Sequence, residues 1–291
     1  MKVGLLTNSL AWAGMKELRE IAAWAAAHGF ADLEVGPSIP LDERVFNEVL
    51  EEGGIGISAL IYCRNFLSEN PQEAAEHQRN LKERLVFAHQ VGIQKVVCST
   101  GVTPASFNGM RFDPEKSVAA VAEFLQGLAD LAEAQQVKIC IENCPMMGNI
   151  AISPYMWEIL FDKVRSDYLG LAFDPSHMVW QFMSPYENII KFREKIFHVH
   201  GKDTEVLYDN LNRVGILHNI TTEGHFYPQQ WWRHRLPGLG DLDWNKIVAN
   251  LDEIGYTGVI SIEHEDPVWE GTLEKVQQGL LKAKNHIESF L

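Results

Sequence analysis

Short apolar runs alternate with longer polar–apolar segments along the whole chain. The short runs are rich in strand-forming residues, and the longer segments carry apolar residues at helical spacing. This alternation predicts a parallel sheet covered by helices. We expect eight strands, each followed by a helix: Lys2–Ser9, Asp32–Gly36, Gly56–Cys63, Lys95–Gly101, Lys138–Asn143, Leu169–Asp174, Ile196–Lys202 and Gly258–Glu263.

A glycine that ends a helical segment recurs before three of these strands. It occupies the third position of Ala27-His28-Gly29-Phe30, Gln90-Val91-Gly92-Ile93 and Glu253-Ile254-Gly255-Tyr256. Glycine caps a helix in the left-handed conformation without the steric cost that a Cβ brings. This repetition favours a single-domain (β/α)8 TIM barrel over residues 1–291. A doubly wound open sheet is the alternative, but no Gly-x-Gly-x-x-Gly follows the first strand.

Residues 204–239 form an insertion between the seventh strand and its helix. The segment is rich in aromatic and basic residues: Tyr208, Phe226, Tyr227, Trp231, Trp232, Arg213, Arg233, Arg235, His218, His225 and His234. In a barrel it would leave the C-terminal face, where active sites lie. We expect an enlarged loop that acts as a lid, and a subunit contact is an equal alternative.

Charge and hydropathy exclude several classes of partner. Asp and Glu total 39 against 25 Lys and Arg, so the formal charge of -14 repels nucleic-acid phosphates and anionic membranes. The longest apolar run, Ile21–Ala27, is far shorter than the roughly 20 residues of a membrane-spanning helix. The first residues lack the pattern of a secretory signal, so we expect a cytoplasmic protein. We expect buried free thiols at Cys63, Cys98, Cys140 and Cys144.

Four metal-binding residue types stand at the C-terminal ends of strands five to eight. These residues, which we call the strand-end cluster, are Glu142, Asp174, His200 and Glu263. The four strands are neighbours around a barrel, so their ends converge. Three carboxylates and one imidazole suit Mn²⁺, which we favour, and also Mg²⁺, Co²⁺ or Zn²⁺. The alternative is that each acid caps a helix or pairs with a lysine.

Five motifs resemble those of the sugar phosphate isomerase/epimerase superfamily, which has a xylose isomerase-like barrel. They are Ile141-Glu142-Asn143, Phe173-Asp174-Pro175-Ser176-His177, His198-Val199-His200-Gly201-Lys202-Asp203, Pro237-Gly238-Leu239-Gly240-Asp241-Leu242-Asp243-Trp244 and Ile262-Glu263. The superfamily includes ketose 3-epimerases, hydroxypyruvate isomerases, inosose dehydratases and endonuclease IV. The resemblance implies that the strand-end cluster binds one divalent metal, that Glu142 and Glu263 exchange the substrate proton, and that His177 contacts a substrate oxygen. An arginine of the compact epimerases is absent near Val206, and the three-metal ligand set of endonuclease IV is not matched.

Four further residues are candidates for substrate contact. His177 and Lys202 follow strands six and seven, Glu34 ends strand two, and Trp12 offers an aromatic face to a sugar. The alternative for His177 is a structural hydrogen bond, and the alternative for Lys202 is a position in a solvated loop. The alternative for Glu34 is a structural role against the barrel floor, and for Trp12 it is packing in the core. His198 stands two residues before His200, so it points to the same face of the strand, and we expect it to be a core histidine.

The chemistry of such a site is proton transfer next to a carbonyl. A divalent cation stabilises the enolate, and two carboxylates on different sides of a sugar remove and return the proton. We therefore expect a metal-dependent isomerase or epimerase of a small keto-sugar or related carbohydrate. A lyase that eliminates from a 3-keto glycoside or an inosose is one alternative, and a noncatalytic sugar-binding or scaffold subunit is another. Homo-oligomers are common among such barrels, but no residue argues for one here.

Overall fold

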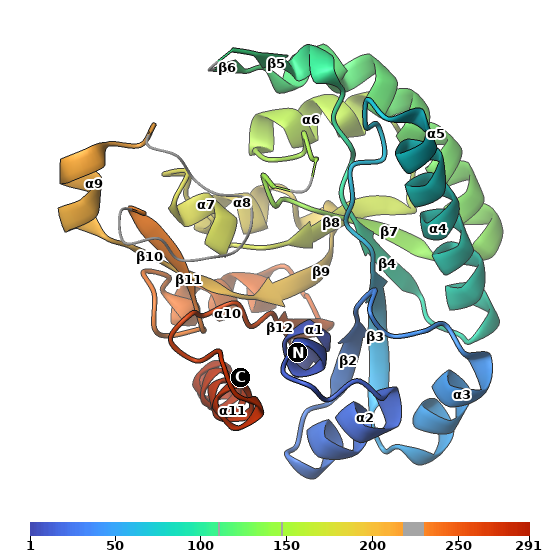
Figure 1. The fold of residues 1–291 in the computed structure, drawn as a ribbon, viewed down its shortest axis with the longest axis vertical. Helices are drawn as coiled ribbons and strands as arrows, with labels where there is room; N and C mark the ends of the chain where they lie inside the picture. The colour runs from blue at the N-terminus through green and yellow to red at the C-terminus, as the bar shows by residue number, and fades with distance from the viewer. Residues whose placement is uncertain (110, 147, 218–229) are drawn as a thin grey trace.

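Eight parallel strands close into a barrel in the computed structural model, which describes residues 1–109, 111–146, 148–217 and 230–291. The strand order is β1-β12-β9-β8-β7-β4-β3-β2, and helices surround the barrel (Figure 1). The first strand pairs with the last, with Lys2 opposite Val259, and also with β2, where Leu6 lies opposite Glu34. The predicted TIM barrel is therefore confirmed, and the open sheet is excluded.

The element bounds follow the predicted alternation. The strands are β1 Lys2–Leu6, β2 Asp32–Val35, β3 Gly56–Ile61, β4 Lys95–Cys98, β5 Phe107–Asn108, β6 Arg111–Phe112, β7 Lys138–Glu142, β8 Leu169–Phe173, β9 Ile196–Gly201, β10 Asp203–Val206, β11 Trp232–Arg235 and β12 Val259–Ile262. The α-helices are α1 Asn8–Trp12, α2 Leu18–Ala27, α3 Glu43–Glu52, α4 Pro71–Gln90, α5 Val118–Gln135, α6 Pro154–Lys163, α7 Ser176–Val179, α8 Tyr186–Lys191, α9 Tyr208–Val214, α10 Trp244–Glu253 and α11 Leu273–Glu288. Three 3-10 helices complete the set: Pro104–Ser106, Pro114–Ser117 and Arg193–Lys195.

The barrel strands end one to three residues earlier than expected. The first strand was predicted to reach Ser9, but it ends at Leu6 because the short helix α1 begins at Asn8. The last strand begins at Val259 and ends at Ile262, so Glu263 follows it directly. Of the four residues that we assigned to strand ends, Glu142 and His200 therefore lie within β7 and β9, whereas Asp174 and Glu263 directly follow β8 and β12 and start loops of the C-terminal face.

The expected insertion contains regular structure. Strand β10 pairs antiparallel with β11, with Asp203 opposite Arg235 and Val206 opposite Trp232, and α9 lies between them in sequence. This hairpin projects from the end of β9 (Figure 1). The enlarged segment expected after the seventh strand is therefore present, its two ends pair with each other, and its action as a lid stays a prediction. Of the aromatic and basic residues in the segment, His218, His225, Phe226 and Tyr227 lie outside the described residues.

Backbone and core agree with the sequence pattern. The predicted helix-capping glycines Gly29, Gly92 and Gly255 have φ angles of 75°, 76° and 71°, which a residue with a Cβ adopts only at a cost. Small and aliphatic side chains fill the barrel interior: Leu6, Ala59, Ile61, Cys63, Val97, Cys140 and Ala172. A second apolar layer lies between strands and helices, where α4 and α5 pack side by side (Figure 1).

Two sequence expectations concern membrane-spanning segments and thiols. All four cysteines are free and buried, as expected. None of the described helices is both long and apolar enough to cross a bilayer.

Candidate active site

The strand-end cluster converges at the C-terminal face of the barrel. One ligand atom from each of Glu142, Asp174, His200 and Glu263 lies within 4.8 Å of every other, and all four residues are buried. The Nδ1 atom of His200 lies 3.2 Å from Glu263 Oε2, 3.5 Å from Glu142 Oε1 and 3.9 Å from Asp174 Oδ2. The expected convergence of these four side chains is therefore present in the fold.

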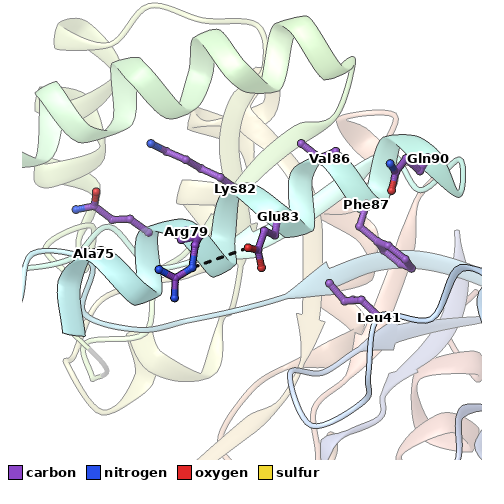
Figure 2. Close-up of a pocket in the computed structure, with 9 residues that line it drawn as sticks. Leu41, Ala75, Arg79, Lys82, Glu83, Val86, Phe87 and Gln90 are labelled. Carbon is purple, nitrogen blue, oxygen red and sulfur yellow. Dashed lines mark ion pairs between the residues drawn. The ribbon is translucent and has the colours of Figure 1, made fainter. Parts of the chain in front are cut away.

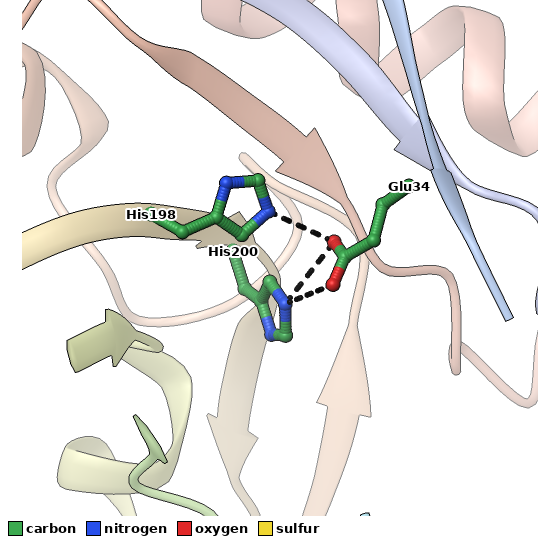
Figure 3. Close-up of side chains that lie close together, drawn as sticks. All are labelled: Glu34, His198 and His200. Carbon is green, nitrogen blue, oxygen red and sulfur yellow. Dashed lines mark hydrogen bonds and ion pairs between the residues drawn. The ribbon is translucent and has the colours of Figure 1, made fainter. Parts of the chain in front are cut away.

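Glu34 orients the histidine of the cluster. Its fully buried carboxylate lies between the rings of His198 and His200, as Figure 3 shows. The Nε2 atom of His200 lies 3.3 Å from each Glu34 oxygen, and that of His198 lies 3.0 Å from Oε2. Burial opposes the charge on Glu34, but the two histidines hold its pKa well below its ordinary value. An ionised carboxylate only accepts, so Nε2 of His200 donates and Nδ1 is the ring nitrogen that faces the cluster.

For Glu34 we weighed a contact with a sugar hydroxyl against a structural role at the barrel floor. Both of its oxygens contact imidazoles beneath the cluster, and a contact with a sugar stays a prediction. A bulge in the register between β2 and β3, at Leu33 and Glu34, accompanies this inward position. His198 accordingly has a structural partner, as expected of a core histidine. Glu34 is a positioning residue in this arrangement.

Two asparagines fix the loops that carry the acids. Asn143 donates from Nδ2 to the carbonyl of Asp174 at 2.9 Å and accepts from its N–H at 2.7 Å. Asn149 donates from Nδ2 to the carbonyls of Glu142 and Cys144 at 2.7 and 2.9 Å. Both amides are buried, so these bonds hold the ends of β7 and β8 in register. Sequence reasoning did not assign either residue, although Asn143 stands within one of the quoted motifs.

Lys202 neutralises part of the negative charge. Its buried Nζ lies 2.7 Å from Glu263 Oε2, 3.1 Å from Asp174 Oδ2 and 3.2 Å from Glu265 Oε2. Burial opposes its charge, but the carboxylates, Asp174 first, hold its pKa well above the ordinary value. It lines the same cavity as Glu263, so its ammonium is within reach of a bound molecule.

His177 lies against the cluster from helix α7. Its Nε2 is 3.4 Å from Asp174 Oδ2 and 3.7 Å from Glu142 Oε1. The ring is fully buried, and neither nitrogen has a hydrogen-bond partner within the described structure. An unpaired buried imidazole is costly, which is typical of a group that meets a ligand.

The two glutamates of the cluster have opposite electrostatic environments. Burial opposes the charge on Glu142, yet His177 and His200 hold its pKa well below its ordinary value. Burial raises the pKa of Glu263, Lys202 opposes this shift, and Glu142 and Glu265 add to it. Paired carboxyl groups whose environments separate their pKa values are a common arrangement for proton transfer.

The donor set fits a divalent cation. Ligands of one ion at about 2.0–2.2 Å lie at most about 4.4 Å apart, and the three measured His200 distances are shorter than that limit. Asp174 Oδ2 and His200 Nδ1 are buried and make no hydrogen bond within the described ranges; their nearest charged neighbours are Lys202 Nζ at 3.1 Å and Glu263 Oε2 at 3.2 Å, respectively. A carboxylate behind the imidazole, here Glu34, is the usual companion of a metal-binding histidine.

A cavity of about 770 Å³ opens above the cluster. Glu142 and Glu263 form part of its wall, and Trp12, which is 66% exposed, lines it from the end of α1. Its volume is within the range of about 300–1,000 Å³ that is common for small-molecule sites. Trp12 therefore lines the cavity with an exposed side chain, and its contact with a sugar stays a prediction.

The β10–β11 hairpin supplies cavity residues that sequence reasoning did not assign. His234 lies 3.6 Å from Glu265 Oε2 through Nε2, and its ring packs edge-on against His177 at a centroid distance of 5.5 Å. Burial lowers the pKa of His234 to about 3, and Lys202 nearby lowers it as well. Beside it, Trp232 stacks on Trp180 with centroids 4.6 Å apart. The aromatic richness of the insertion was the available signal.

Ion pairs anchor this hairpin. Arg235 donates to Asp266 Oδ2 at 2.8 Å and to Glu205 Oε2 at 2.5 Å, and Arg233 donates to the same Glu205 oxygen at 2.7 Å. Asp203 accepts four N–H bonds, among them those of Gly238 and Leu242 in the Pro237–Trp244 motif. That motif therefore shapes the return of the chain from the insertion.

A second concave surface lies outside the barrel, on helix α4. Leu41, Val86 and Phe87 give it an apolar lining, and Arg79 pairs with Glu83 at its edge (Figure 2). It contains no residue of the strand-end cluster. We therefore assign the chemistry to the barrel cavity.

Comparison with known proteins places the chain in a family with this fold. Residues 22–286 match the family model of the xylose isomerase-like TIM barrel. The inosose dehydratase of Clostridium perfringens is 27% identical over 275 residues, which cover 90% of this chain and 86% of that protein. The uncharacterized protein YfiH of Bacillus subtilis is 25% identical, with coverage of 91% and 93%.

Two solved structures show the same fold. The IOLI protein with a binding zinc atom has a TM-score of 0.74 at 20% identity, with coverage of 100% of this chain and 99% of that one. The D-psicose 3-epimerase of Clostridium cellulolyticum with D-tagatose has a TM-score of 0.72 at 17% identity, again with coverage of 100% and 99%.

Proposed function

Because the chain belongs to the xylose isomerase-like TIM barrel family, we propose that it is a divalent-metal-dependent sugar isomerase or epimerase. The observation that carries the proposal is the convergence of two glutamates, an aspartate and a histidine at one buried point below an open cavity. The reaction is proton transfer at a carbon next to a carbonyl. A binding role alone would not need two carboxylates with separated pKa values.

The metal is held by Glu142, Asp174, His200 and Glu263 in this proposal. When bound, it supplies positive charge that stabilises an enolate oxygen. We favour Mn²⁺, and Mg²⁺, Co²⁺ and Zn²⁺ suit the same oxygen-rich donor set. A zinc-bound structural neighbour supports a divalent ion without fixing its identity.

Glu142 and Glu263 move the proton. Each carboxylate can accept a proton from carbon and return it, and the lowered pKa of Glu142 and the raised pKa of Glu263 give the two groups different basicities. Transfer on opposite faces of a carbon inverts a stereocentre, and transfer on one face between adjacent carbons interconverts aldose and ketose. Lys202, 2.7 Å from Glu263, orients that carboxylate.

The substrate is a carbohydrate, as the named activities of the relatives support. Lys202 lines the cavity and would contact its oxygens, and Trp12 would pack against its C–H face. His177, which lies beside Asp174 and Glu142, would contact an oxygen held next to these carboxylates. The cavity is lined by four glutamates, Glu142, Glu263, Glu265 and Glu270, against the three basic side chains of Arg64, Lys202 and Arg233, so a neutral sugar fits better than a sugar phosphate. Its volume leaves room for a glycoside.

A dehydratase is the second candidate, and the likeness to inosose dehydratases favours it. The first step, removal of a proton next to a carbonyl by a glutamate, is shared. Elimination then requires an acid at the leaving oxygen, and His177 and Lys202 are the available donors. The outcome of the reaction therefore depends on where the substrate places its leaving group.

Solvent exchange tests the proposal directly. The protein is incubated with Mn²⁺ in D₂O with a panel of keto-sugars, inososes and 3-keto glycosides, and products are followed by NMR. We expect deuterium at the carbon next to the carbonyl, with an epimer or isomer. Exchange with release of water or an alcohol would identify a lyase instead. Absence of exchange across the panel would leave a sugar-binding or scaffold subunit and refute the catalytic proposal.

A further inference from the structure

A second cluster of metal-binding side chains lies beside the strand-end cluster. One ligand atom from each of Glu142, Cys144 and His177 lies within 4.8 Å of the other two, and all three residues are buried. We call it the thiol cluster. It shares Glu142 with the strand-end cluster: Oε1 of this carboxylate lies 3.7 Å from His177 Nε2 and 3.5 Å from His200 Nδ1, and Oε2 accepts from the Cys63 thiol at 3.4 Å.

The backbone holds the thiol cluster in place. Asn149 donates to the carbonyls on both sides of Asn143, those of Glu142 and Cys144, at 2.7 and 2.9 Å. His177 comes from a different segment, at the start of α7. The convergence of the three side chains therefore does not arise from neighbouring positions in one turn.

His177 supplies an independent sign of an absent partner. It is 0% exposed, and both ring nitrogens lack a hydrogen-bond partner among the residues described. A buried imidazole with two unpaired nitrogens costs free energy that a ligand would recover. Cys144 is 9% exposed and lines the cavity, so a cation can reach the thiol from solvent.

The donor types select the ion. A thiol, an imidazole and a carboxylate form a softer set than three carboxylates and one imidazole, and thiolate ligands favour Zn²⁺ over Mn²⁺ and Mg²⁺. We propose that Glu142, Cys144 and His177 form a second metal site, selective for Zn²⁺ or Co²⁺. Binding releases the Cys144 thiol proton to solvent as the sulfur–metal bond forms.

The second site has a functional consequence that rests on the proposed function. A metal bound there engages Glu142 and His177, the groups that we assign to proton transfer and substrate contact. Excess Zn²⁺ therefore inhibits, whereas excess Mn²⁺ does not. The thiol cluster differs from the strand-end cluster in its ligands, because only the thiol cluster includes a sulfur atom.

Cobalt reports the two sites separately. The full chain is stripped with a chelator and titrated with Co²⁺, with bound metal counted by elemental analysis and thiolate ligation read from the near-ultraviolet charge-transfer band. We expect two bound equivalents, one of which produces the band. Cys144→Ser loses the band and one equivalent. Cys98→Ser, a matched control for a buried thiol outside every candidate metal group, keeps both.

Each of the remaining outcomes of the Co²⁺ titration would overturn one of the two proposed metal sites. One bound equivalent without the band would overturn the second site and leave the strand-end centre intact. One equivalent with the band would overturn the strand-end centre and retain the thiol site. A band that persists in Cys144→Ser would assign the sulfur to another cysteine and refute the proposal. Circular dichroism of each variant shows that the barrel has folded, so loss of metal is not loss of structure.

Discussion

Replacement of Glu34 by glutamine tests how the barrel prepares its metal-binding histidine. The carboxylate accepts from two imidazoles, those of His198 at 3.0 Å and His200 at 3.3 Å. A glutamine of the same shape offers one accepting oxygen and one NH₂ group. One imidazole N–H therefore loses its acceptor in a fully buried position, and His200 is free to rotate or to change tautomer.

The expected magnitude follows from the role of such partners. Removal of a hydrogen-bond partner behind a metal ligand lowers metal affinity by about 10–100-fold, which corresponds to about 1.4–2.8 kcal/mol. The unpaired buried donor costs about 1–3 kcal/mol of folding free energy in addition. We expect Glu34→Gln to bind Mn²⁺ more weakly by this factor and to unfold at lower urea concentration than the unchanged protein.

Isothermal titration calorimetry with Mn²⁺ measures the affinity, and urea denaturation measures the stability. Glu48→Gln is the matched control, because Glu48 pairs with Arg19 and Arg44 on the outer helices, far in the fold from the cluster. Unchanged Mn²⁺ affinity in Glu34→Gln, with the control also unchanged, would refute the positioning role. It would mean that His200 does not bind the metal through Nδ1.

Two further predictions concern the metal and the hairpin. Removal of the metal with a chelator should abolish deuterium exchange and lower the melting temperature, because the buried carboxylates lose their counter-ion. Addition of Mn²⁺ should restore both the exchange and the melting temperature. Full exchange in the chelated protein would contradict a metal-dependent reaction. Burial opposes the charge on Glu205, but Arg233 and Arg235 lower its pKa in the folded protein. The ionised Glu205 therefore stabilises the fold above the unfolded pKa of about 4.3, and this stabilisation is lost as pH falls through the lower folded pKa. The melting-temperature difference between the unchanged protein and Glu205→Gln should thus shrink in acid, and a difference that grows there would show that the ion pairs do not anchor β11.

The sequence predicted the barrel because its pattern is local. Each strand and helix follows from a run of residues, and glycines such as Gly92 and Gly255 mark the helix ends with φ angles that the structure reproduces. The convergence of the strand-end cluster was also predictable, since all four residues stand at the ends of neighbouring strands. Their roles as ligands stay predictions.

Other parts of the site depend on contacts between distant segments. The position of Glu34 beneath His200 joins residues 166 apart in the chain, and strand parity alone does not show which group it faces. His234 enters the cavity only because β11 pairs with β10 across the insertion. Asn143 and Asn149 act through backbone bonds to loops that no periodic pattern describes.

The central claim is that one cation binds where β7, β8, β9 and β12 end. The most direct measurement is an anomalous difference map from crystals of the full chain grown with Mn²⁺ as the only divalent metal. We predict a peak about 2.0–2.2 Å from an oxygen of Glu142, Asp174 and Glu263 and from Nδ1 of His200. A map without a peak at this point, or with Lys202 Nζ there and the metal elsewhere, would contradict the account.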